Sequence, residues 1–196
     1  NAVCGIVTLL VLFAIGKRLH NERFAWWWVL IYAGTFLPHL YFKSGIIDPW
    51  FNLFIFLGIY FLSRCLTNQQ ERKPLLASLM LSALFTGLGI LTKGPVALLV
   101  VLLSYALFLF FNRGKGWVAF KYYLLWGAGV VLVTLLWFGL EILQHGWWFV
   151  NEFITYQIRL AKTEDAGHGG FFLYHFVVVI IGCFPASLLI FRYINQ

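Results

Sequence analysis

Seven stretches of apolar residues follow one another along the chain, separated by short polar or charged segments. They cover residues 2–16, 24–42, 46–62, 74–91, 95–111, 122–143 and 171–191. A helix needs about 20 residues to cross the hydrocarbon core of a bilayer, with a range of about 17–25, and backbone groups in lipid must bond within their own segment. The pattern therefore predicts an all-α, polytopic transmembrane helix bundle of about seven spans. We expect the first span to be clipped at the start of the sequence; the third reaches spanning length only if it begins near Asp48, and the fifth is slightly short.

The composition supports lipid as the solvent of this bundle. Hydrophobic residues make up 62% of the chain and charged residues only 11%, whereas a soluble domain has about 25% charged residues. Aromatic residues, including nine Trp, reach 20% and gather near the ends of the apolar stretches, as in the aromatic belts of membrane proteins. The three cysteines are scattered without metal-ligand spacing and are interpreted as small apolar residues.

The charges predict an orientation. The formal net charge is +7, but the basic residues form short clusters between apolar stretches, which argues against nucleic acid as a partner. Alternate connections hold ten and four basic residues. The richer set comprises Lys17, Arg18, Arg23, Arg64, Arg72, Lys73, Arg113, Lys115, Lys121 and Arg192, and the poorer set Lys43, Lys93, Arg159 and Lys162. By the positive-inside rule the richer set is cytoplasmic. In a cytoplasmic membrane, Asn1 is therefore expected on the external side and Gln196 on the cytoplasmic side.

The first two external connections each carry an ionisable residue beside an apolar stretch. Asp48 precedes Pro49, a pair that is typical of a helix start; a carboxylate at this depth is also costly and is often functional. Lys93 lies in a four-residue connection that ends with Gly94 and Pro95. Its ammonium could extend to lipid head groups or bind a phosphate at the membrane surface, and the residues leave both readings open for each position.

The third external connection, residues 144–170, is the longest. Its first part predicts an amphipathic helix lying in the membrane interface, with Arg159 and Lys162 on the polar face and Gln157 on the apolar one. The guanidinium of Arg159 matches phosphate oxygens. His168 follows between glycines, which would give it the freedom to approach a ligand. With Glu164 or Asp165 it could bind a divalent metal, although the chain has no convincing metal motif.

These motifs resemble the membrane glycosyltransferases of the GT-C fold, in the branch that contains protein O-mannosyltransferases and the aminoarabinose transferases of lipid A. The likeness is carried by the segment around Asp48-Pro49, by residues 87–95 with Thr-Lys-Gly, and by the long connection from Trp147 to His168 with the helix after it. The family often has Trp after the proline at 185, where this chain has Ala186. The resemblance implies a single GT-C transmembrane domain over residues 1–196.

The resemblance also implies a function. Such enzymes transfer a sugar, with inversion, from a polyprenyl-phosphate donor to a protein or glycolipid acceptor outside the cytoplasm, among membrane lipids. Lys93 and Arg159 would bind the carrier phosphate, with Lys162 and His168 nearby, and Asp48 would be a supporting acidic residue. The principal catalytic base of the family belongs to an earlier external loop. We therefore expect the chain to be an inactive excerpt, lacking that loop and a carboxy-terminal part.

Two other classes of function use the same residues. A transporter or flippase for a lipid-linked anion would show inverted repeats and interrupted helices at mid-membrane, and no such repeat is visible in the sequence. A non-catalytic assembly subunit would satisfy its external charges locally. The glycines at 87, 89, 127 and 129 permit close helix packing in all three classes.

Overall fold

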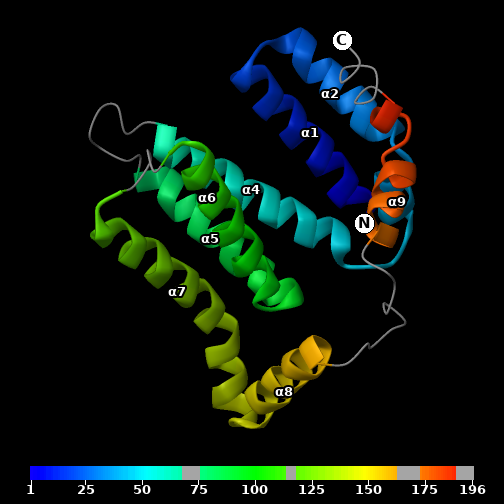
Figure 1. Ribbon diagram of the computed structural model, residues 1–196. Coiled ribbons are helices and arrows are strands. Elements are labelled where there is room, and N and C mark those ends of the chain that lie inside the picture. Colours follow the sequence, from blue (N-terminus) through cyan, green and yellow to red (C-terminus); the bar gives the residue numbers. More distant parts are fainter. Residues whose placement is uncertain (68–75, 114–117, 163–172, 189–196) are drawn as a thin grey trace. The chain divides into compact units, whose positions relative to one another are not determined.

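The computed structural model of the chain describes residues 1–67, 76–113, 118–162 and 173–188, and every regular element in these ranges is an α-helix (Figure 1). The residues fall into two compact units. The first consists of Asn1–Pro49 and Glu164–Gln196, and the second of Trp50–Thr163. The all-α membrane bundle predicted from the sequence is confirmed.

Four of the seven predicted segments form single helices long and apolar enough to cross a bilayer. These are α1 (Ala2–Leu19), α4 (Asp48–Thr67), α5 (Leu76–Lys93) and α7 (Phe120–His145). A fifth, α6 (Val96–Phe111), is apolar but has 16 residues. The other two predicted segments differ from the prediction, because each is interrupted close to a proline.

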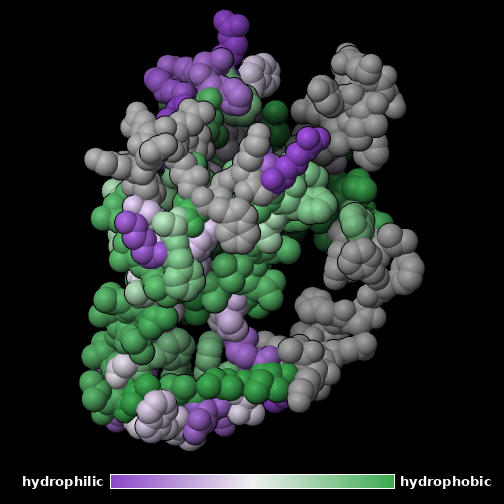
Figure 2. Space-filling view, turned by 60° about the vertical axis from the view of Figure 1, so that its left-hand side comes forward, coloured by the Kyte–Doolittle hydropathy of each residue, from purple (hydrophilic) through white to green (hydrophobic). Residues whose placement is uncertain are grey.

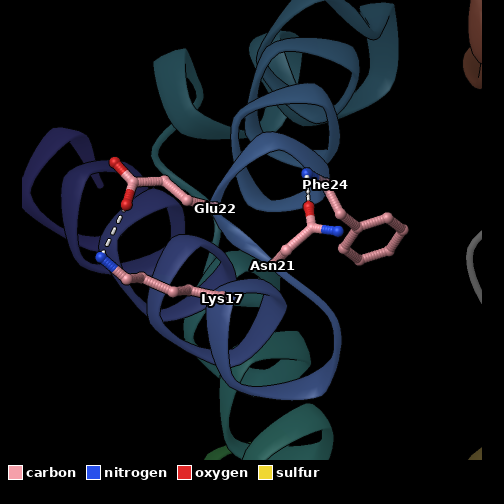
Figure 3. Close-up of polar contacts among 4 residues, drawn as sticks. All are labelled: Lys17, Asn21, Glu22 and Phe24. Carbon is pink, nitrogen blue, oxygen red and sulfur yellow. Dashed lines mark hydrogen bonds and ion pairs between the residues drawn. The ribbon is translucent and has the colours of Figure 1, made fainter.

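In the first unit, α1 and α2 (Glu22–Gly34) form a hairpin (Figure 1). The helices approach closely at Gly16, where an added Cβ would lie 3.0 Å from the Cα of Ala25. The Asn21 side chain accepts a hydrogen bond from the Phe24 amide at 2.8 Å and so caps α2 (Figure 3). Beside it, Lys17 bonds Glu22 at 2.8 Å. This bond lowers the pKa of the exposed Glu22 carboxylate.

The predicted segment 24–42 is two helices, α2 and α3 (Phe36–Lys43), with extended backbone at Thr35. In a continuous helix the ring of Pro38 would clash with the carbonyl of Gly34, four residues earlier. The break frees backbone groups that lipid cannot satisfy. The Phe36 amide instead donates to the carbonyl of Phe184 at 3.1 Å.

The predicted final segment 171–191 is also interrupted. Helix α9 (Leu173–Gly182) is followed by a turn over residues 183–185, because a continuous helix would place the Pro185 ring against the carbonyl of Ile181. The prediction of an uninterrupted span is therefore wrong here, while its two ends lie outside the described residues. The Cβ position of Gly182 lies 3.1 Å from the Cβ of Leu37, so α9 packs on α3.

Helix α5 is the centre of the second unit (Figure 1). Small residues let its neighbours approach: an added Cβ at Gly129 of α7 would lie 2.9 Å from the Cβ of Ala83, and one at Gly89 would lie 2.9 Å from the Cβ of Ala97 on α6. This close packing of small residues is typical of helix association in membranes.

A buried hydroxyl joins three helices of this unit. Ser82 of α5 donates from Oγ to the carbonyl of Gly58 on α4 at 2.8 Å. The same Oγ accepts a hydrogen bond from Trp126 Nε1 on α7 at 3.1 Å. Ser82 is fully buried, so these bonds satisfy a group that would otherwise be costly in an apolar interior.

The surface agrees with a membrane environment. On the face drawn in Figure 2, hydrophobic side chains dominate the described surface and hydrophilic ones form small patches. Helix α7 carries a row of exposed leucines, among them Leu132, Leu136 and Leu143, which are 61%, 64% and 84% exposed. Lipid, or another part of a larger protein, must cover such a helix.

Candidate functional site

The turn between α5 and α6 carries the candidate lysine. Helix α5 ends at Lys93, and Gly94 follows with φ +81°, in the left-handed region that favours glycine. The Gly94 amide donates to the carbonyl of Ile90 at 2.7 Å and closes the helix. Pro95 then precedes α6. The short connection predicted over residues 92–95 is confirmed as a tight turn at Gly94 and Pro95, and its first two residues are the last two of α5.

The amphipathic helix predicted after Trp147 is also confirmed, as α8 (Trp148–Lys162). Its inner side packs on α7, where the ring of Phe138 lies 5.2 Å from that of Phe153. Its middle reaches the lysine turn, because an added Cβ on Gly94 would lie 2.5 Å from the side-chain nitrogen of Gln157. The second and third external connections predicted from the sequence therefore meet in one unit.

Lys93 is held beside the start of α4. Its ammonium lies 5.6 Å from the centre of the Phe51 ring, within the range of a cation–π interaction. Phe51 is 9% exposed and belongs to the apolar core of this unit. The lysine side chain is itself exposed, and the aromatic ring holds its charge at the end of α5.

Arg159 lies on the same helix as Gln157 but on a different side. Two residues of helix correspond to a rotation of about 200°, so Arg159 points away from the Gly94 contact. Its guanidinium lies 5.6 Å from the centre of the Tyr156 ring and is exposed. The structure thus brings the helix that carries Arg159 onto the Lys93 turn, with Gln157 as the residue in contact.

The other predicted site residues have different outcomes. Asp48 is half-buried and is the first residue of α4, with Pro49 in the first turn, so the predicted helix start is confirmed; by the division into units it belongs to the first. Lys162 is the last residue of α8. His168, with Glu164 and Asp165, lies outside the described residues.

Two residues of this site were not predicted from the sequence. Gln157 was placed on the apolar face of its helix, and an amide among apolar residues is the signal that could have marked it as a contact residue. Phe51 follows Asp48 by three positions, and nothing in its neighbourhood distinguishes it from the other aromatic residues of the chain.

The protein is thus a membrane helix bundle in which an amphipathic helix contacts a turn that carries a lysine. Comparison with known families gives the class of this protein. Residues 1–138 match the family described as dolichyl-phosphate-mannose-protein mannosyltransferase. The chain belongs to this family of membrane glycosyltransferases. The match includes Asp48 and Lys93 and ends before α8.

One relative can be named. The chain is 24% identical over 188 residues to the undecaprenyl phosphate-alpha-4-amino-4-deoxy-L-arabinose arabinosyl transferase of Photorhabdus laumondii subsp. laumondii. The alignment covers 94% of this chain and 33% of the relative, so the chain spans about a third of that enzyme's length. No solved structure matches the chain.

Proposed function

We propose that the chain is part of an inverting glycosyltransferase that moves a sugar from a polyprenyl-phosphate donor to an acceptor on the extracytoplasmic side of the membrane. The observation that carries the proposal is the contact between Gly94 and Gln157. It holds the helix that carries Arg159 against the turn of Lys93, while the Arg159 side chain extends from another side of that helix. Membership of the family and the name of the relative support the same donor class.

The chemistry follows from the leaving group. A base removes the proton of an acceptor hydroxyl, the oxygen attacks the anomeric carbon, and the bond from that carbon to the lipid phosphate breaks. Negative charge then develops on the phosphate. Fixed cations that meet this charge stabilise the transition state more than the ground state, which is the role that we assign to Lys93 and Arg159.

The remaining predicted residues take supporting roles in this proposal. Asp48 is assigned a supporting acidic role, and Lys162 and His168 are assigned to binding of the donor or the acceptor. The acceptor is a protein or a glycolipid, and the orientation places Asn1 outside and Gln196 inside. These assignments rest on the sequence motifs and on the distribution of basic residues.

The test is sugar transfer by the full-length protein from a labelled polyprenyl-phosphate sugar. Removal of one electrostatic donor at a developing oxyanion costs about 100–1,000-fold in kcat, so Lys93→Ala and Arg159→Ala should each lose about that factor. Lys43→Ala is the matched control, because Lys43 is an exposed lysine at the end of α3 on the same predicted side. Transfer at the wild-type rate in both site variants would refute the phosphate assignment.

A further inference from the structure

An apolar cavity of about 200 Å³ lies within the second unit. Its wall combines the last turns of α4, the first turns of α5 and α7, and the middle of α6. Representative lining residues are Leu62, Cys65, Leu79, Tyr122, Trp126 and Gly127. A hydrogen bond of 2.6 Å between the hydroxyls of Tyr105 and Tyr123 joins α6 to α7 at this cavity.

This cavity is separate from the proposed phosphate site. Leu79 in its wall and Lys93 at the turn are 14 positions apart on α5, which corresponds to about 21 Å along a helix that rises about 1.5 Å per residue. The two features therefore lie near opposite ends of the same bundle. By the orientation predicted from the basic residues, the cavity lies toward the cytoplasmic leaflet.

The lining determines what can fill the cavity. Its walls are almost wholly apolar, and such cavities favour hydrocarbon over water. At its edge, Leu102 is 47% exposed, so that the cavity opens on a surface of a bundle whose natural surroundings are lipid chains. The acyl chain of a membrane lipid matches this apolar lining.

A cation next to the cavity favours a lipid with an anionic head group. The ammonium of Lys121, at the start of α7, lies 5.1 Å from the centre of the Tyr122 ring, and Tyr122 is part of the cavity wall. Lys121 is exposed, and a lysine at the head-group level attracts anionic lipid. Charge and lining together therefore fit a molecule with one hydrocarbon chain in the cavity and one phosphate outside it.

We propose that this cavity is a binding site for an anionic phospholipid, with an acyl chain between α4, α5, α6 and α7 and the phosphate on Lys121. The site is independent of the glycosyl-transfer site and does not require the donor lipid. Because a ligand that binds only the folded state stabilises it by mass action, occupancy should raise the thermal stability of the protein.

Two glycines of α7 provide the test. An added Cβ on Gly127 or on Gly139 would meet nothing within 4 Å, but only Gly127 lines the cavity. Gly127→Leu should therefore fill the space of the lipid chain, and Gly139→Leu is the matched control. The full-length protein, delipidated in detergent, is titrated with phosphatidylglycerol, phosphatidylcholine or a polyprenyl phosphate while the apparent Tm is followed.

Phosphatidylglycerol should raise the apparent Tm of the wild type and of Gly139→Leu by several degrees, and this rise should disappear in Gly127→Leu. Lys121→Gln, which leaves the cavity intact, should reduce the preference for phosphatidylglycerol over phosphatidylcholine. Native mass spectrometry of the same samples should show one bound phosphatidylglycerol fewer in Gly127→Leu than in Gly139→Leu.

Three results would overturn the proposal. The first is an equal response of Gly127→Leu and Gly139→Leu to phosphatidylglycerol. The second is a wild type that phosphatidylcholine stabilises as well as phosphatidylglycerol does. The third is a Gly127→Leu variant that has lost the response to the polyprenyl phosphate but has kept the response to phosphatidylglycerol, which would assign the cavity to the carrier chain.

Discussion

The contact between α5 and α7 predicts opposite effects for one substitution at two glycines of the same helix. Gly127 and Gly129 both lie inside α7, so replacement by Ala gains the same helix propensity at each, about 0.5–1 kcal/mol. The two positions differ only in the space available for an added Cβ. A Cβ at Gly127 meets nothing within 4 Å, whereas one at Gly129 would lie 2.9 Å from the Cβ of Ala83.

The distance sets the magnitude. Carbon atoms in contact prefer about 3.5–4.0 Å, so Gly129→Ala must push α5 and α7 apart by roughly 0.6–1 Å at this point. Overpacking of this kind costs about 1–3 kcal/mol. The propensity gain cancels in the comparison, and Gly129→Ala should therefore be about 1–3 kcal/mol less stable than Gly127→Ala.

The assay is the unfolding of the full-length protein in detergent micelles by added denaturing detergent, followed by Trp fluorescence. The double variant Ala83→Gly/Gly129→Ala restores the space between the helices, so it should show a favourable coupling energy of about 1–2 kcal/mol relative to the two single variants. Equal stability of Gly127→Ala and Gly129→Ala, or additivity in the double variant, would refute the close approach of α5 and α7.

Three further predictions concern polar contacts. Ser82→Ala removes the hydrogen bonds to Gly58 and from Trp126 and should cost about 0.6–1.7 kcal/mol per bond in the same assay. Ser63→Ala, at an exposed serine of α4 whose hydroxyl donates to the Tyr60 carbonyl of its own helix, should cost less. Asn21→Ala removes the cap of α2 and should lower stability by about 1 kcal/mol, with Asn21→Asp retaining most of it. Glu22→Gln removes the ion pair with Lys17. The pKa of Glu22 is lowered in the folded state, so the pair stabilises the protein at pH values above the usual pKa range of glutamate. This contribution is lost as the pH falls through that range. The difference between Glu22→Gln and wild type should thus vanish in acid and shrink in high salt at pH 7, and a difference that is independent of both would contradict the ion pair.

The helix boundaries show which parts of the fold can be predicted from the sequence. The end of α5 at Lys93 and the start of α8 at Trp148 agree with the predicted segments within two residues, because charge, glycine and amphipathic periodicity are local signals. The break at Thr35 is not predicted, although Pro38 is a local signal for it. Hydropathy averaged over a window does not respond to one proline, so the segment 24–42 reads as one helix.

The site could be predicted only in part. Periodicity assigned Arg159 to the polar face of its helix, and the charge distribution put Lys93 on the same predicted side, but neither signal specifies which helix face meets which turn. That information lies in the fit between Gly94 and Gln157, where a missing Cβ makes room for a side chain 63 positions later in the sequence. A contact of this kind is a property of tertiary packing and has no local signature.

The hydrogen bond from the Phe36 amide to the Phe184 carbonyl has a consequence for biosynthesis. The acceptor is made 148 residues after the donor, which at about 5–20 residues per second takes roughly 7–30 s. During that interval, α2 and α3 have been made, but the Phe36 amide between them has no hydrogen-bond acceptor within its own segment. We expect this early part of the nascent chain to stay near the insertion machinery, or near water, until its late partner arrives.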